Sequence, residues 1–270
     1  MKIVDAFTFF DELELLEMRL RELAPVVDAF VLVESDTSFA GHRKPLVFHE
    51  HRERFAEYPI EYVCVRDMPG GDDAWAREHF QRDAIARGLG ALAPDDIVMI
   101  SDVDEIPRRE SVAHLRDLHR DITFFQMRLS YFAFNYVRKG EPQGGLLYTT
   151  AVHADRARTE SPSELRESRR PYHRKGYEDD GGTRFLRDAG WHLSYFGDEE
   201  RIRGKIRNFS HQEHNTEELL ASLNLEEITS SRRDIFGREK FHWEVVPSVT
   251  DLPDAVRRDP GKYGHFFVSA

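Results

Sequence analysis

The chain has 270 residues, a formal net charge of −11 at pH 7 and 40% hydrophobic residues, so it can bury a core as one large or two small domains. The excess of acidic residues argues against a nucleic-acid-binding protein, which needs a basic face opposite the phosphates. A single cysteine excludes an intrachain disulfide. The sequence shows neither a secretory leader nor an apolar run of membrane-spanning length, so we expect a cytoplasmic protein without a transmembrane segment.

Strand-like and helix-like patterns alternate over the first 130 residues. The expected strands cover residues 2–10, 29–35, 60–65 and 96–101. The expected helices cover residues 12–23, 74–90 and 108–118. This alternation is typical of βαβ units, in which helices cover both faces of a parallel sheet. The second and fourth strands are almost continuously apolar, as expected for strands that are buried on both sides.

The pattern becomes mixed in the second half of the chain. Strand character is expected over residues 122–140, 146–153 and 185–197, and helices over 198–209 and 216–228. The polar, arginine-rich stretch 154–183 predicts a functional loop, either ordered or mobile. We therefore predict a single α/β domain over residues 1–246, with a central, mostly parallel sheet flanked by helices and a mixed, β-rich second half. An irregular tail is expected over 247–270.

A cluster of carboxylates follows the fourth strand in the segment "DIVMISDVDEIP". Ligands bind outside the carboxyl ends of the strands in an open parallel sheet, so Asp102 and Asp104 are expected to project into that crevice. In an extended chain they point to the same side and can share one Mg²⁺ or Mn²⁺ with substrate phosphates. The alternative is a turn into the next helix, in which Glu105 and Pro107 help the helix to begin. The metal site and the turn into the helix are compatible with each other.

Several segments, taken together and in order, resemble glycosyltransferase family 17. They are "FTFFDELELLEMRLRELAPVVDAFVLVES", "KPLVF", "DMPGG", "DIVMISDVDEIPRR" and "GWHLSYFG". The resemblance implies a GT-A-like (Rossmann-like) fold and a UDP-sugar donor with N-acetylglucosamine as its sugar. It also implies a divalent metal (Mn²⁺ or Mg²⁺) at Asp102 and Asp104, which form a D-x-D motif, and inversion at the anomeric carbon. It implies that residues 1–130 bind the nucleotide sugar and that 131–246 bind a carbohydrate acceptor. The stretch 154–183 matches the family poorly, so the donor is better supported than the acceptor.

Three further residues are candidates for binding the nucleotide sugar. Glu34 ends the second strand at the sheet edge, where it either accepts hydrogen bonds from a sugar hydroxyl or caps the next turn. Arg82 lies one helical turn from Glu78, which is typical of a surface ion pair, and the resembling family carries an arginine there. An arginine at this place can reach the diphosphate or orient the D-x-D. Asp83 is a weaker candidate beside it.

Four residues are candidates for the metal site and for catalysis. His192 in "GWHLSYFG" is a candidate third metal ligand, with His211 as its competitor and a core histidine as the alternative. Lys205 either neutralises the leaving diphosphate or lies on a solvated helix face. Glu213 is the candidate general base, because the family has an acidic residue near that place. Its rivals are Asp179, Asp180 and Asp188.

These residues together predict a metal-dependent inverting glycosyltransferase that moves a sugar from a UDP-sugar to a glycan hydroxyl. One alternative is a hydrolase or nucleotidyltransferase that acts on nucleotide diphosphates with the same metal clamp. The other is a carbohydrate-binding protein without turnover. Aromatic residues of the second half are candidates for stacking on acceptor sugars, although most are expected in the core: Tyr131, Phe132, Phe134 and Tyr136.

Overall fold

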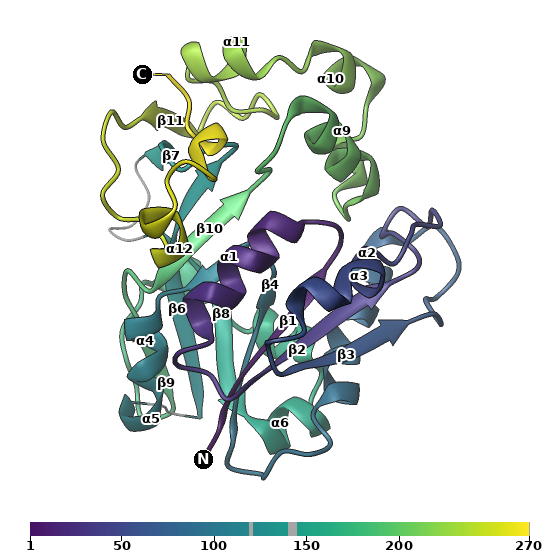
Figure 1. Ribbon diagram of the computed structural model, residues 1–270, viewed down its shortest axis with the longest axis vertical. Coiled ribbons are helices and arrows are strands. Elements are labelled where there is room, and N and C mark those ends of the chain that lie inside the picture. The colour runs from purple at the N-terminus through teal and green to yellow at the C-terminus, as the bar shows by residue number, and fades with distance from the viewer. Residues whose placement is uncertain (119–120, 140–144, 270) are drawn as a thin grey trace.

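A computed structural model describes residues 1–118, 121–139 and 145–269 of the protein. In this part of the chain, eleven strands form one sheet (Figure 1), whose main path has the order β11-β7-β6-β8-β4-β1-β2-β3. The strands are β1 (Ile3–Phe9), β2 (Ala29–Ser35), β3 (Ile60–Val65), β4 (Ile97–Asp102), β5 (Glu105–Pro107), β6 (Ile122–Tyr131), β7 (Tyr136–Lys139), β8 (Leu146–His153), β9 (Thr183–Leu186), β10 (Gly190–Ser194) and β11 (His242–Val245).

The helices flank this sheet and are mostly short. The α-helices are α1 (Leu13–Leu23), α2 (Val47–His51), α3 (Ala74–Asp83), α4 (Arg109–Ala113), α5 (Leu115–Leu118), α6 (Ala154–Thr159), α7 (Pro162–Glu167), α8 (Tyr172–Lys175), α9 (Glu199–Asn208), α10 (Glu217–Ser222), α11 (Leu225–Ser230) and α12 (Asp254–Arg258). The 3₁₀ turns are η1 (Arg52–Phe55), η2 (Ala84–Gly88), η3 (Gln212–His214) and η4 (Gly264–Phe266). None of these described helices has both the length and the hydropathy to cross a membrane.

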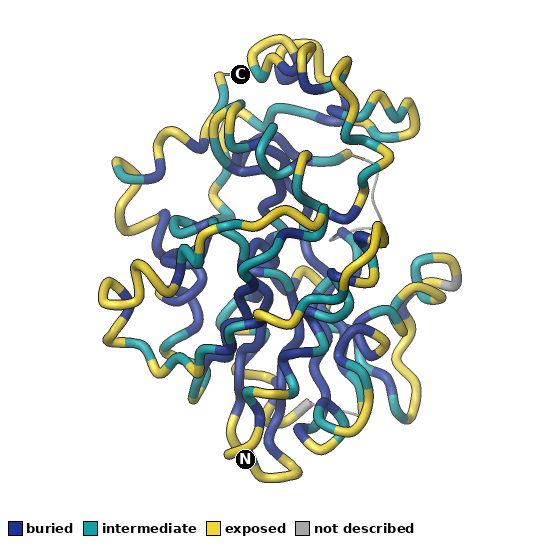
Figure 2. Tube along the Cα trace, turned by 90° about the vertical axis from the view of Figure 1, so that its right-hand side faces the viewer, coloured by how far each residue is buried: buried dark blue, intermediate teal, exposed yellow. Residues whose placement is uncertain are grey.

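The N-terminal half of the sheet is parallel, as the alternating pattern predicted. Strands β3, β2, β1 and β4 run side by side in one direction, so their carboxyl ends meet at one edge. The register places Thr8, near the end of β1, beside Asp102, the last residue of β4. The residues of β1 are buried along its whole length, because helices cover both faces of this half. Figure 2 shows buried segments, in dark blue, running through the middle of the molecule.

The second half of the sheet is mixed. Strand β8 runs antiparallel to β4 and β6, and β7 runs antiparallel to β6 and β11, whereas β9 and β10 are parallel to β6. The predicted α/β class is confirmed: the chain is a single α/β domain with a parallel first half, a β-rich second half and flanking helices. The sheet as a whole is mixed rather than mostly parallel, because the antiparallel strands lie within it.

The polar stretch 154–183 is ordered rather than an open loop. It contains the short helices α6, α7 and α8, and α7 packs against α3. The Ser161 hydroxyl accepts a hydrogen bond from the N–H of Glu164 (3.1 Å), and Pro162 occupies the first helical position, so the sequence itself defines where α7 begins. The position of this helix start also sets the position of Arg166, which lies one turn further along α7.

The C-terminal segment is part of the core rather than an irregular tail. Beyond residue 247 the chain forms α12 and η4, and α12 packs against α1. Val256, Tyr263 and Phe266 are buried in one cluster with Leu15 and Met18 of α1. Phe134 lies in the same cluster, and Tyr136 is fully buried in another, which places both of these aromatic residues in the core.

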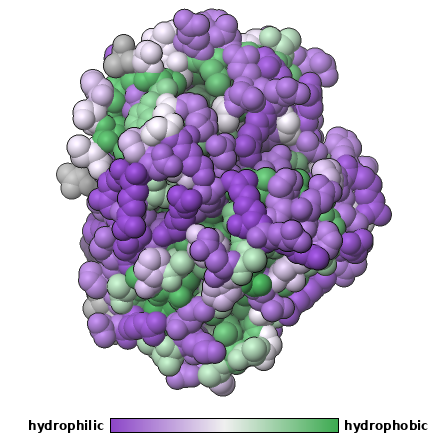
Figure 3. All heavy atoms as spheres, in the orientation of Figure 1, coloured by the Kyte–Doolittle hydropathy of each residue, from purple (hydrophilic) through white to green (hydrophobic). Residues whose placement is uncertain are grey.

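The surface of the face seen in Figure 3 is mainly hydrophilic, with smaller hydrophobic patches.

Candidate active site

A cavity of about 540 Å³ lies at the edge where β1 and β4 end, as expected for a ligand site in a parallel α/β sheet. Both halves of the chain line it. Its charged lining residues include Arg82, Asp102, Asp104, Glu105, Arg166 and Lys205. Its aromatic lining residues include Trp75, Tyr195, Phe209 and Phe236. The cavity therefore combines a charged region with an aromatic one.

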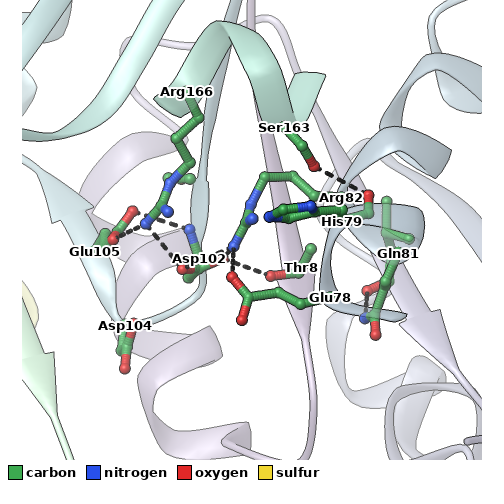
Figure 4. A network of polar contacts seen from close by, with 12 residues as sticks. Thr8, Glu78, His79, Gln81, Arg82, Asp102, Asp104, Glu105, Ser163 and Arg166 are labelled. Carbon is green, nitrogen blue, oxygen red and sulfur yellow. Dashed lines mark hydrogen bonds and ion pairs between the residues drawn. The ribbon is translucent and has the colours of Figure 1, made fainter. Parts of the chain in front are cut away.

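Asp102 is held by a hydroxyl and two guanidinium groups. Its carboxylate accepts hydrogen bonds from Thr8 Oγ1 (2.8 Å), Arg82 Nη2 (3.0 Å) and Arg166 Nη2 (2.9 Å). Figure 4 shows both arginines pointing toward this carboxylate. Burial on its own would raise the pKa of Asp102, but Arg166 and Arg82 together hold that pKa well below its ordinary value. Asp102 is therefore ionised whenever the protein is folded at neutral pH.

Asp104 has a different set of partners. Its carboxylate accepts a hydrogen bond from Lys205 Nζ (2.7 Å) and lies 3.6 Å from His192 Nε2. In Figure 4 it points away from the arginines that hold Asp102. Burial would lower the pKa of Lys205, but Asp104 and Glu12 outweigh this effect and raise it. The predicted site residues Arg82, Asp102, Asp104, His192 and Lys205 thus all line one cavity.

The metal that the resemblance implies can be tested against these side chains. Asp104 and His192 fit a divalent ion, because a carboxylate oxygen and an imidazole nitrogen face each other at 3.6 Å. The Nδ1 of His192 is buried without a hydrogen-bond partner among the described residues, unlike a core histidine satisfied by the backbone. Asp102 is less available because two arginines contact it. Within the described chain, Asp102, Asp104 and His192 do not form a group whose ligand atoms all lie within 4.8 Å.

Arg166 and Glu105 are site residues that the sequence did not reveal in this role. Glu105 is 1% exposed, forms an ion pair with Arg166, and accepts a hydrogen bond from the backbone N–H of Asp102 (3.1 Å). It does not help a helix to begin, because it lies in β5 and α4 starts only at Arg109. It instead holds the backbone of the D-x-D segment and the guanidinium group of Arg166 in place.

Arg19 supports the segment 102–105 through hydrogen bonds to its backbone. It is fully buried on α1 and binds Asp5 of β1 through two hydrogen bonds, of 2.7 and 2.6 Å. Its Nη1 donates to the backbone carbonyls of Asp102 (2.9 Å) and Glu105 (2.7 Å), and its Nη2 donates to Ser101 Oγ (2.6 Å). One guanidinium therefore ties the first strand and the first helix to the segment that carries the D-x-D.

A sequence profile described as glycosyltransferase family 17 matches residues 1–254. The chain belongs to glycosyltransferase family 17. The curated relatives include the β-1,4-mannosyl-glycoprotein 4-β-N-acetylglucosaminyltransferases of Rattus norvegicus and Homo sapiens. Each is 33% identical in an alignment of 152 residues, and the match covers 52% of this chain and 28% of the relative. The matched part of the chain thus spans less than a third of the length of these relatives.

Solved structures to which this family 17 chain is similar have low sequence identity. One is TarS 1–349 of S. aureus in complex with UDP, with 14% identity and a TM-score of 0.42 over 85% of this chain and 72% of that one. Another is the glycosyltransferase GlyE of Streptococcus pneumoniae, with 14% identity and a TM-score of 0.34 over 69% of this chain and 46% of that one.

Two residues predicted to bind the donor lie outside the cavity of this family 17 protein. Both oxygens of Glu34 are occupied, by the N–H groups of Phe48 (3.0 Å) and His49 (3.3 Å) in the first turn of α2. Asp83 accepts hydrogen bonds from the hydroxyl of Ser161 and the N–H of Ser163 (2.7 and 2.8 Å). Neither is among the described cavity residues. Each acts as a capping carboxylate, which for Glu34 is the alternative stated above.

We expect the substitution Glu34→Gln to change stability rather than donor binding. The side chain is fully buried, and the neutral amide loses charge-assisted hydrogen bonds to the backbone of α2 and to Tyr62 (2.9 Å). The expected loss is about 1–3 kcal/mol of unfolding free energy, measured by urea denaturation. The KM for the donor should remain within twofold. A KM that rises tenfold at unchanged stability would contradict this assignment.

The candidate general bases lie at the edge of the cavity or outside it. The Glu213 side chain is 58% exposed and does not belong to the described cavity lining. Its Oε1 lies 2.6 Å from Nδ1 of His211, which does line the cavity. The rivals Asp179, Asp180 and Asp188 are also absent from the described lining. The assignment of Glu213 as a general base stays a prediction.

Proposed function

We propose that the chain transfers a sugar from a UDP-sugar to a hydroxyl group of a carbohydrate acceptor with inversion, and that N-acetylglucosamine is the transferred sugar. One observation carries this proposal. The charged lining of the cavity places the D-x-D carboxylates beside two buried arginines, of which Arg82 Nε and Nη1 and Arg166 Nε have no hydrogen-bond partner among the described residues. A metal-bound diphosphate needs both kinds of group, because carboxylates hold the ion while guanidinium groups hold the phosphates.

The arginine pair, Arg82 and Arg166, supports the diphosphate part of the proposal. Arg82 Nε and Nη1 and Arg166 Nε are buried and have no hydrogen-bond partner among the described residues. Each unsatisfied buried donor costs about 1–3 kcal/mol, so an anion that accepts from these groups removes a penalty present in the free protein. Asp102 fixes the planes of both guanidinium groups through its hydrogen bonds. The orientation of both guanidinium groups is thus fixed before the donor binds.

Asp104 and His192, with Asp102 beside them, would hold the divalent cation. When bound, such an ion stabilises the negative charge that develops on the departing diphosphate. Lys205 adds a fixed positive charge at the same place, because its ammonium group is kept protonated by Asp104 and Glu12. Protein cations and the ion would then act on the same leaving group.

The aromatic part of the cavity supports a carbohydrate acceptor. Trp75, Phe209 and Phe236 line it without being fully buried, so part of each side chain is accessible to a ligand. The apolar face of a pyranose ring can pack on such side chains while its hydroxyl groups reach polar ones. We place the acceptor here and the donor diphosphate at the arginine pair.

The decisive experiment measures UDP release from UDP-N-acetylglucosamine with Mn²⁺, with and without oligosaccharide acceptors. The proposal predicts release that depends on acceptor, and a rise in thermal midpoint with donor and Mn²⁺ together. The Asp104→Asn substitution should reduce turnover by about 100-fold or more because it weakens the hold on the leaving group. Release without acceptor would favour a hydrolase. Glycan binding that is unchanged in Asp104→Asn, with no release in the parent, would favour a non-catalytic protein.

A further inference from the structure

A short turn after α9 brings two imidazoles and a carboxylate together. One ligand atom from each of His211, Glu213 and His214 lies within 4.8 Å of the other two. We propose that these three residues, the rim triad, bind a divalent transition metal ion at a site separate from the D-x-D. This inference does not depend on the proposed transfer reaction.

The backbone of the turn sets the geometry of the rim triad. Residues Gln212–His214 form η3, and side chains three residues apart in a 3₁₀ turn lie above one another. This spacing brings His211 and His214 to the same side. The N–H of His214 donates to the carbonyl of His211 (3.0 Å), which closes the turn. The two ligands are therefore adjacent because of local backbone structure, without help from distant contacts.

Aromatic side chains hold the two imidazoles in place. The ring of His211 packs edge-on against Trp75 with centroids 4.6 Å apart, and the ring of His214 stacks on Phe236 at 4.3 Å. Glu213 in turn contacts Nδ1 of His211 at 2.6 Å. A metal site needs ligands whose orientation is fixed by their surroundings, and these packing contacts supply that support.

The chemistry of the three donors suits a transition metal. Two imidazole nitrogens and one carboxylate favour Zn²⁺, Ni²⁺ or Co²⁺ over Mg²⁺ or Ca²⁺, which prefer oxygen ligands. Ligand bonds of about 2.0–2.2 Å place donor atoms about 3–3.5 Å apart. The three ligand atoms lie within 4.8 Å of one another, so side-chain rotations are enough to bring them to one ion. The side chain of Glu213 is 58% exposed, which leaves it room to rotate toward an ion held by the two imidazoles. The ion would lie at the edge of the cavity, because both histidines line it.

The charges around the rim triad also differ from those at the D-x-D. Among the described residues, Glu213 pairs with an imidazole, whereas Asp102 pairs with arginines and Asp104 pairs with a lysine as well as with the imidazole of His192.

The test is binding of Co²⁺ and Zn²⁺ to the full chain after removal of metal with a chelator. We expect one equivalent to bind in the Asp104→Asn variant with a visible Co²⁺ spectrum that indicates imidazole ligands. His211→Ala and His214→Ala should each weaken this binding by at least about tenfold. The matched control is His265→Ala, which removes an exposed histidine that also lies beside a carboxylate, Glu14 (3.4 Å). It should bind metal like the parent.

The outcomes separate a metal site from a general base. If Glu213→Gln and His214→Ala lose the metal to a similar degree, the rim triad is confirmed as a site. If His214→Ala binds Co²⁺ as tightly as the parent, or if Asp104→Asn binds none, the inference is wrong. The three exposed or half-exposed side chains can be replaced without disturbing the core, and the thermal midpoint of each variant in the absence of metal checks this.

Discussion

Arg19→Met is expected to lower the free energy of unfolding by about 3–5 kcal/mol, because it leaves the carboxylate of Asp5 buried without its partner. Both side chains are 0% exposed, so solvent cannot replace the lost contacts. For a chain of this size the thermal midpoint should fall by about 10 °C. Turnover should also fall, since the carbonyls of Asp102 and Glu105 lose their donor and the D-x-D segment loses its brace. Thermal denaturation and steady-state kinetics measure the two effects.

The double variant Asp5→Leu/Arg19→Met separates these effects. It replaces the buried ion pair by apolar side chains, so most of the stability should return. Turnover should stay low, because the two carbonyls still lack a donor. As a matched control, Arg54→Met removes an ion pair with Glu17 whose arginine is 43% exposed, and it should cost at most about 1 kcal/mol. Wild-type turnover in the double variant would show that Arg19 does not support the site.

The sequence predicted the parallel half of the fold well because its signals there are local. Continuous apolar strands such as β2 leave few other arrangements, and its predicted bounds agree with Ala29–Ser35. The position of Asp102 and Asp104 at the sheet edge follows from that topology. Arg82, His192 and Lys205 line the same cavity as the D-x-D. Each lies on an element whose type the pattern indicated.

Other features could not be predicted because they depend on contacts between distant segments. Arg166 lies in a polar stretch whose composition is typical of a loop, and nothing local shows that α7 packs on α3. The C-terminal segment lacks periodicity, yet Tyr263 is fully buried beside α1. The sequence does hold a signal for this pair, because a carboxylate in the middle of a buried strand requires a cation, and Arg19 on the first helix is one of the candidates.

Arg166→Met is expected to reduce turnover by about 100-fold or more and to lower the unfolding free energy by about 2–4 kcal/mol. The substitution removes a cation that contacts both Asp102 and Glu105, and Glu105 is 1% exposed. It also removes one of the two guanidinium groups proposed to bind the donor diphosphate. Arg156→Met on the neighbouring α6 is the matched control. Its ion pair with Glu160 is exposed on both sides, so it should leave turnover unchanged.

A second substitution distinguishes the two roles of Arg166. In Arg166→Met/Glu105→Gln the buried carboxylate no longer carries a charge, so stability should return toward the parent value. If Arg166 served only to neutralise Glu105, turnover and affinity for UDP would return with it. If it also binds the diphosphate, calorimetry should still show affinity for UDP weakened by at least about tenfold, because a buried guanidinium bond to an anion contributes about 1.5–3 kcal/mol. Recovery of stability without recovery of UDP binding therefore assigns Arg166 to the donor.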